Sequence, residues 1–564
     1  MPRLATLLAI LAAVACRAWL HFTTALVPGM NGGYYLVQAR SLIEKGSLGI
    51  PDLPLVFTLH SLLARMIHAL SPLDLNHSVM LAVKLGDSIL PPLAIITVML
   101  LGWCWSRNKT SRLDWLLAAL AGIGIVAGPA ALSMVGEFEK NSLGLALLCC
   151  LAWAMRRWMA RPGLQTGLTA VAFLGLIGIT HIGVFGTALI FAASSFGALS
   201  LVQGREGLIR VGRLLLFAAP VAAAAGALVF WKFDPSRITK LLHAFSEPAD
   251  YLSGGMGPPG MGMLPPDVNV GWLAWLPGLL VAILVIIAAA VAWFGPGDES
   301  RADAAVMTGA ALTVIALTGP WVHGDKVMRF YLNAAPLILL CALYALLHVR
   351  RPWIRGVLGV FLLGGYLGAG SFQLARGGRP VVTEEAQAEL KTLVPLVKDA
   401  SSTLIVARHG LEWWTAWTLH THIAQAQALS SEDWKKFKEV WFIQPKGNMG
   451  PGGFGLGPGG PGGQRGPEGP PGIFGFFTGG NRPKSPPGGR QGPPGMGGPG
   501  RPGGRGGPGG GPGGMMGAVI PEDAEILHDG THYTLARVAV PPEFVVERER
   551  SPLDPFGDWD ALIR

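Results

Sequence analysis

The residues best suited to chemistry lie in a polar stretch between apolar segments, residues 28–55. In chain order they are Asn31, Tyr34, Tyr35, Arg40, Glu44 and Asp52. A carboxylate can orient or deprotonate a hydroxyl group, and a guanidinium group can hold a phosphate through two parallel hydrogen bonds. The paired tyrosines are candidate substrate contacts beside these groups. The stretch therefore combines side chains that can exchange protons with a side chain that can bind an anion.

Two further polar clusters interrupt the apolar sequence. Glu137 and Glu139 separate two apolar segments and are candidate catalytic acids, or they form an ordinary solvated loop. His323, Lys326 and Arg329 lie between two later segments and are candidate ligands of a donor phosphate, or they pair with a neighbouring aspartate. Arginine suits phosphate because its planar guanidinium group matches the phosphate oxygens.

Three ionisable residues lie near the ends of apolar segments: Lys84, Asp87 and His181. Charged groups in a membrane span are costly, so each is a candidate substrate-binding residue. Lys84 and Asp87 share a helical face and can instead pair with each other, and His181 can be an interfacial residue. No metal-binding motif is present, and the five cysteines lie in apolar runs, which indicates neither a disulfide framework nor a metal site.

The elements that must position these residues are membrane helices. Of the 564 residues 50% are hydrophobic and 14% are charged, against about 25% charged residues in soluble domains. A membrane span needs about 20 mostly apolar residues. About eleven segments qualify: 4–27, 79–105, 113–135, 141–159, 164–180, 182–202, 211–231, 271–294, 303–321, 329–348 and 354–375. The predicted fold class is mainly α, a polytopic membrane protein.

Basic residues in short loops predict the orientation, because Lys and Arg are enriched on the cytoplasmic side. They cluster after the second, fourth, sixth and tenth spans. These alternate loops place the N-terminus inside and the C-terminus outside a cell (inner) membrane. The first outer loop, 28–78, then faces outward with the other candidate residues, and 53–70 is expected to form an interfacial helix.

Residues 376–450 and 518–564 predict a small extracytoplasmic α/β domain, following a membrane domain at 1–375. The expected elements are an amphipathic helix at 382–398, a strand at 403–407, a helix at 411–428, another helix from Ser431, a strand at 440–444 and a hairpin within 525–539. The residues that follow the first strand, 408–414, are a candidate ligand site, because such sites favour the carboxyl ends of strands. Aromatic packing of the domain onto the membrane surface is the favoured alternative.

A Gly/Pro-rich tract, residues 451–517, divides this domain. Of its 67 residues 46 are Gly or Pro, so we expect a disordered insertion. It holds six basic residues and one acid, which is +5 of the formal net charge of +9. The rest of the chain is nearly neutral, and the sequence therefore gives no sign of a nucleic-acid partner.

The first outer loop resembles that of the membrane-embedded GT-C glycosyltransferases, which include protein O-mannosyltransferases and aminoarabinose transferases. The resemblance rests on Asn31-Gly32-Gly33-Tyr34-Tyr35, then Ala39-Arg40, then Glu44 and Gly46. The family often has Asp-Glu-Ala-Tyr-Tyr, Ala-Arg, an acid and Gly in this frame. About twenty residues carry the motif, and the topology of the chain is similar.

The resemblance implies transfer of a sugar from a polyprenyl-phosphate carrier in the lipid bilayer to a glycan, lipid or protein acceptor at the outer face. Arg329, with Lys326 or Arg40, would hold the lipid phosphate. Asp52, Glu44 or Glu137 would orient or deprotonate the acceptor hydroxyl. Many enzymes of this family use a divalent metal, although nothing in this sequence specifies a site for one.

The chain departs from the family at its catalytic aspartate, which is Asn31 here. An amide cannot act as a general base. Three interpretations stay open: another acid serves, the acceptor needs no strong base, or the protein is a non-catalytic relative. A rival class is a transporter or flippase of lipid-linked glycans, or a scaffold without chemistry. Transporters commonly contain internal repeats, and this sequence shows no convincing one.

Overall fold

The structure is a computed structural model of the chain. It describes residues 2–213 except Arg107, 298–319, 321–322, 326–425, 435–446 and 520–539 except Glu522, together with positions 216, 283 and 286. Several predicted features therefore lie largely or wholly outside the described residues. They are the spans at 211–231 and 271–294, the helix expected from Ser431, the Gly/Pro-rich tract and His323.

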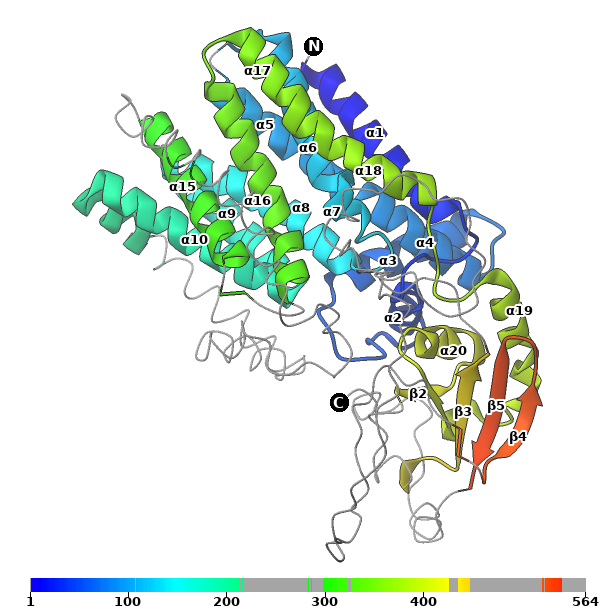
Figure 1. The fold of residues 1–564 in the computed structure, drawn as a ribbon. Helices are drawn as coiled ribbons and strands as arrows, with labels where there is room; N and C mark the ends of the chain where they lie inside the picture. Colours follow the sequence, from blue (N-terminus) through cyan, green and yellow to red (C-terminus); the bar gives the residue numbers. More distant parts are fainter. Residues whose placement is uncertain are drawn as a thin grey trace, which may run out of the picture.

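Most of the described chain is a bundle of α-helices (Figure 1). The helices before the first gap are α1 (Pro2–Phe22), α2 (Gly32–Lys45), α3 (Leu55–Leu70), α4 (Leu75–Ile89), α5 (Ile95–Trp105), α6 (Arg112–Ala127), α7 (Pro129–Leu132), α8 (Glu139–Ala160), α9 (Leu164–Gly178) and α10 (Ile182–Gln203). After it come α15 (Asp298–Thr318), α16 (Lys326–His348), α17 (Pro352–Gly359), α18 (Gly365–Arg376), α19 (Glu384–Thr392) and α20 (Leu411–Leu419). Short 3₁₀ helices occupy Pro91–Ala94, Val394–Leu396 and Ala400–Ser402, and a π-helical turn at Val360–Gly364 joins α17 to α18.

Eight helices within the described residues are long and apolar enough to cross a membrane. They coincide with eight of the predicted spans. A ninth prediction, 164–180, forms a helix, but α9 has only 15 residues and is shorter than a typical span. The interfacial helix expected at 53–70 is present as α3, with one buried face.

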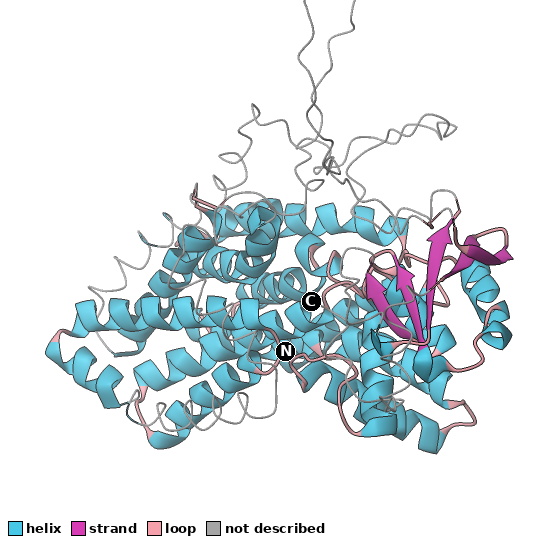
Figure 2. Ribbon diagram, turned by 90° about the horizontal axis from the view of Figure 1, so that it is seen from below, coloured by secondary structure: helices cyan, strands magenta, loops and turns pink. Residues whose placement is uncertain are grey.

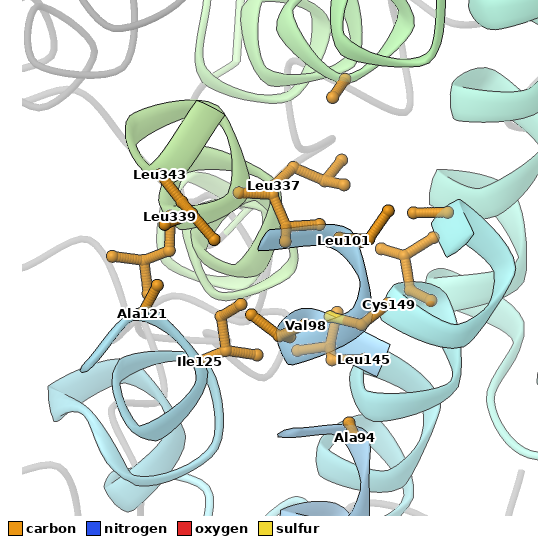
Figure 3. Close-up of a cluster of buried hydrophobic side chains, with 14 of the residues drawn as sticks. Ala94, Val98, Leu101, Ala121, Ile125, Leu145, Cys149, Leu337, Leu339 and Leu343 are labelled. Atoms are coloured by element: carbon orange, nitrogen blue, oxygen red, sulfur yellow. The ribbon is translucent and has the colours of Figure 1, made fainter. Parts of the chain in front are cut away.

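The bundle core consists largely of small and branched apolar side chains, contributed by most of the bundle helices. Figure 3 shows Val98 of α5, Ile125 of α6, Cys149 of α8 and Leu343 of α16 meeting between their helices. Alanine and glycine allow close helix approach, and a Cβ on Gly102 would lie 2.6 Å from that of Ala118. The buried cysteines thus act as small apolar residues, as their sequence context predicts.

Polar contacts fasten one end of the bundle. Arg156, at the end of α8, donates to Asp303 of α15 at 2.5 Å, and the indole of Trp105 donates to the same carboxylate at 3.0 Å. Arg355 of α17 lies 3.0 Å from Asp114 of α6. These contacts place residues near the ends of the second, fourth and tenth predicted spans at one end of the bundle.

At the opposite end a five-stranded sheet packs beside the bundle (Figure 2). Its strands are β1 (Thr403–Ala407), β2 (His422–Gln425), β3 (Glu439–Pro445), β4 (Glu525–Asp529) and β5 (Tyr533–Val538), in the order β2-β1-β3-β5-β4. The pairs β1–β2 and β1–β3 are parallel, whereas β3–β5 and β4–β5 are antiparallel. The predicted strands at 403–407 and 440–444 and the hairpin are confirmed.

The helix predicted at 411–428 is wrong in its second half. The α20 helix ends at Leu419 because His420 adopts a left-handed conformation, with φ of 58°. Residues 422–425 then pair with the edge of β1 as β2. Their helical pattern is overridden by this sheet pairing between segments separated in the sequence. The predicted helix at 382–398 is also shorter, since α19 ends at Thr392.

The sheet and the first outer loop share one apolar core. It contains Tyr35 of α2 and Phe57 of α3 together with Trp414 of α20 and Ile405 of β1, all nearly or fully buried. Gly33 is the contact point, since a Cβ there would lie 2.9 Å from the Cβ of Trp413. The chain therefore places the start of α2 directly against α20.

We expect Gly33→Ala to weaken this packing. The added methyl group meets the side chain and backbone of α20 at 2.9–3.1 Å, and such overpacking costs about 1–3 kcal/mol. The apparent melting temperature of the purified protein in detergent should fall. Gly197→Ala in α10 is the control, because its new methyl group meets nothing within 4 Å. Equal melting temperatures for the two variants would contradict the close approach.

Candidate functional site

One contact between sequence-predicted site residues joins two separate polar loops, at Asn31 and Glu137. The Asn31 amide Nδ2 donates to Glu137 Oε1 at 2.9 Å. The backbone N–H groups of Met30 and Asn31 both donate to the other carboxylate oxygen, Oε2, the second at 3.2 Å. The first outer loop and the turn before α8, more than 100 residues apart in sequence, therefore meet at one carboxylate.

Two glycines allow this approach. Gly29 has φ of 85°, and a Cβ there would lie 2.9 Å from the backbone of Gly136 and Glu137. Gly136 has φ of 70°, and its Cβ would lie 2.2 Å from the carbonyl oxygen of Pro28. Both conformations favour glycine. The two loops can therefore touch backbone to backbone, which brings Glu137 under the start of α2.

The environment of Glu137 opposes its ionisation. Burial raises the pKa of this carboxyl group above its usual value, and the hydrogen bonds from Met30 and Asn31 act in the other direction. A carboxyl group with a raised pKa is better suited to exchanging protons near neutral pH. Among the sequence-predicted acids, Glu137 thus combines contact with Asn31 and a perturbed pKa.

The loop that joins β1 to α20 reaches the same place. A Cβ on Gly410 would lie 2.8 Å from the side chain of Met30. His409 Nδ1 lies 2.7 Å from Glu412 Oε1, and this hydrogen bond raises the pKa of His409, with a further contribution from Glu137. Three segments thus converge: the start of α2, the turn before α8 and the 408–412 loop.

Asp52 belongs to a neighbouring buried network. Its Oδ2 accepts hydrogen bonds from the hydroxyl of Tyr34 and the ammonium group of Lys140, and its Oδ1 accepts from the Leu53 N–H at 2.7 Å. Gln38 donates to Tyr34 at 3.2 Å and exchanges hydrogen bonds with the backbone of Ile50. This arrangement fastens the loop after α2 to α2 and α8. It gives Asp52 a fixed positive neighbour.

Arg40 and Glu44 face the sheet side of α2. Arg40 Nε donates to Glu44 at 2.7 Å, and Nη1 lies 3.1 Å from His420 Nε2. The guanidinium carbon of Arg40 also lies 5.6 Å from the ring centroid of Trp417. These contacts join α2 to the end of α20.

The predicted substrate-binding residues near the span ends have individual partners. Lys84 donates to the carbonyl oxygens of Thr24 and Ala25 at 2.7 and 2.8 Å, whereas Asp87 binds side chains of α1. His181 Nδ1 accepts the Val184 N–H at 3.3 Å and so caps α10. Tyr35 is buried among aromatic rings.

Arg329 lies in the first turn of α16 and is exposed. The α16 helix begins at the end of the bundle opposite the Arg156–Asp303 contact and packs against α7, which leads into the Glu137 turn. The α16 helix begins at Lys326, and the neighbouring His323 lies outside the described residues.

Sequence reasoning missed a buried cluster. Arg17 and His21 of α1 bind Asp87 of α4, with His21 Nε2 at 2.8 Å from Asp87 Oδ2. Glu139 of α8 and His60 of α3 lie beside them, 3.4 Å apart. These residues come from four helices and have no common sequence spacing. The sequence singled out Asp87 and Glu139 individually, as charged residues in or between apolar segments, but gave no sign that they meet.

The Asn31–Glu137 pair does not fit a divalent metal. Its two facing groups are an amide nitrogen and a carboxylate whose oxygens already accept three N–H groups. A hard cation prefers several anionic or neutral oxygen ligands. The metal common among GT-C enzymes therefore has no evident place at this pair.

Comparison with solved structures supports the fold. The crystal structure of the Archaeoglobus fulgidus oligosaccharyltransferase in the apo form superposes with a TM-score of 0.51 at 13% identity, over 78% of this chain and 69% of that chain. The same enzyme in complex with Zn and sulfate gives a TM-score of 0.47 at 14% identity, over 77% and 67%. No protein-family model matches the chain, and no curated protein matches its sequence. The first superposition shows a shared fold.

We expect Asn31→Asp to make stability depend on pH. Two carboxyl groups would then meet at the 2.9 Å contact, and their repulsion would raise the pKa of one of them. A pKa raised above its unfolded value gives stability that is present at low pH and lost as the pH rises through the folded value. The apparent melting temperature of the variant, relative to wild type, should therefore be lower at about pH 8 than at about pH 5.

The Asn31→Ala variant is the control. It removes the amide hydrogen bond without adding a charge, so its difference from wild type should be similar at both pH values. A pH-independent difference for Asn31→Asp as well would show that the two side chains do not face each other.

Proposed function

We propose that the protein is a membrane glycosyltransferase of the GT-C type. It transfers a sugar from a polyprenyl-phosphate carrier to an acceptor hydroxyl at the face of the membrane where the sheet lies. The observation that carries the proposal is the contact of Asn31 with Glu137, which joins the motif loop to the next acidic loop. The fold shared with an oligosaccharyltransferase supports it.

Glu137 is the proposed acid–base group. It is the sequence-predicted acid that touches Asn31, and burial raises its pKa. Asn31 would orient this carboxyl group through its amide rather than exchange protons itself. His409, held by Glu412, brings a second titratable group to the same place. Transfer would then be a direct displacement at the anomeric carbon, in which the acceptor hydroxyl loses its proton as the lipid phosphate leaves.

Arg329 is the proposed ligand of the donor phosphate. It is an exposed cation in the first turn of α16. A phosphate on a lipid carrier lies at the headgroup level, where such a side chain can reach it. Arginine can bind two phosphate oxygens at once.

A non-catalytic relative is the second candidate. The observation that favours it is the occupancy of Glu137, whose carboxylate already accepts three N–H groups from the first loop. A purely structural carboxylate would have such partners. Lipid-linked sugar accumulation in a deletion strain separates the two candidates, because only loss of a transferase leaves its donor unused.

We expect Glu137→Gln to lower kcat by about 10²–10⁴-fold, the range for removing a general acid–base group. The glutamine retains an oxygen that can accept one backbone N–H, which favours folding. The assay measures transfer from synthetic polyprenyl-phosphate sugars by purified protein in detergent. Glu299→Gln is the control, since Glu299 pairs with Arg161 at the other end of the bundle. Full activity of a folded Glu137→Gln variant would overturn the assigned role.

We expect Arg329→Ala to raise the KM for the lipid donor with a smaller change in kcat. A hydrogen bond to a charged group contributes about 1.5–3 kcal/mol, roughly 10–150-fold in affinity. Arg329→Lys should fall between, because lysine retains the charge without the planar pair of donors. Arg537→Ala on β5 serves as the control, since Arg537 pairs within the sheet, with Glu525 of β4 at 2.5 Å and Glu439 of β3 at 3.8 Å. An unchanged KM for Arg329→Ala would remove this residue from the donor site.

A further inference from the structure

Four helices bring a second set of ionisable side chains together inside the protein. His21 lies at the end of α1, Asp87 on α4 and Glu139 at the start of α8. One nitrogen or oxygen atom of each lies within 4.8 Å of those of the other two, and all three residues are buried. His60 of α3 completes the group, with Nε2 at 3.4 Å from Glu139 Oε2.

Glu139 is the member whose bonding is incomplete. Its side chain is 1% exposed. Neither carboxylate oxygen accepts a hydrogen bond from the residues that the structure describes. A buried carboxylate is normally hydrogen-bonded, paired with a cation or bound to a metal. The Glu139 oxygens therefore point to a ligand that the protein itself does not supply.

The charges of the cluster favour a cation. Two carboxylates, those of Asp87 and Glu139, share one guanidinium group, that of Arg17, so one negative charge is in excess when the imidazoles are neutral. Arg17 is held on the far side: it binds Asp87 Oδ1, the Asp87 carbonyl oxygen at 2.7 Å and the Val126 carbonyl oxygen at 3.1 Å. The other carboxylate oxygen, Asp87 Oδ2, is not bound by Arg17 and faces His21 within the cluster.

We propose that His21, Asp87 and Glu139, with His60, bind one divalent transition-metal ion such as Zn²⁺. Imidazole nitrogens combined with carboxylate oxygens suit zinc, in tetrahedral geometry with bonds of about 2.0–2.2 Å. Arg17 would not bind the metal itself but would orient the ligating carboxylate of Asp87 through its hydrogen bond to Oδ1. Glu139 lies two residues after Glu137 in the sequence, but the proposed site is separate from the Asn31–Glu137 pair, which does not fit a metal.

The backbone is adapted to admit the fourth side chain. A Cβ on Gly86 would lie 2.6 Å from His60 Cδ2 and 2.8 Å from its Nε2. The glycine next to Asp87 thus allows the His60 ring to lie directly against α4. Its Nδ1 has no hydrogen-bond partner within the described residues, so no such bond opposes a small rotation of the ring.

The test measures metal on the full-length protein in detergent. The protein is stripped with a chelator, dialysed with Zn²⁺ and analysed by mass spectrometry for bound zinc, and Co²⁺ is added in parallel to record its visible absorption. We expect about one ion per chain and a tetrahedral Co²⁺ spectrum. Glu139→Gln should weaken zinc binding by about 100-fold or more, and it should fold, since the substitution breaks no hydrogen bond of Glu139. His21→Gln should act similarly.

Glu137→Gln is the matched control, a carboxylate two residues away that should leave the zinc content unchanged. Loss of zinc in Glu137→Gln but not in Glu139→Gln would overturn the proposal and locate the metal at the outer pair. Wild-type protein without stoichiometric zinc would also overturn it, and would mean that the cluster holds a proton instead. Because metal content is measured without a sugar donor, its outcome is independent of whether the protein is a glycosyltransferase.

Discussion

The arrangement of the candidate site depends on one carboxylate. Glu137 accepts the N–H groups of Met30 and Asn31 and the Asn31 amide, and so joins the start of α2 to the turn before α8. Glycines at 29 and 136 allow the backbones to approach this closely. Because α2 also packs on α20, the position of the sheet relative to the bundle follows from the same joint.

The two ends of the bundle use charge differently. At one end, arginines of α8 and α17 pair with carboxylates of α15 and α6, which ties neighbouring helices together. At the other end, Glu137 accepts N–H groups from the start of α2 and has no cationic partner among its hydrogen bonds within the described residues. Asp52 pairs with Lys140, and Asp87 is shared by Arg17 and His21.

Asn31 changes the character of this end of the bundle. An aspartate there would face Glu137 across 2.9 Å and would need a proton or a cation between them. The Asn31 amide removes that requirement, because it donates a hydrogen bond directly to the Glu137 carboxylate. The incompletely bonded carboxylate is then Glu139, within the bundle.

The sequence by itself determined most of the helices and strands, and it identified several of the polar residues that meet at the end of the bundle near the sheet. Apolar length predicted the eight membrane-length helices of the described residues, short apolar runs predicted β1 and β3, and alternation predicted the hairpin. The loop motif singled out Asn31, and the polar break between two apolar segments singled out Glu137. It could not predict β2, because pairing with β1 overrides helical propensity. Nor could it reveal the His21–Asp87–Glu139 cluster, because its members lie on separate helices with no shared spacing. Asp87 and Glu139 follow His21 by 66 and 118 positions in the sequence, and only tertiary packing brings the three into one buried volume. Charges there are costly unless they are paired or bound to a metal, because water is excluded.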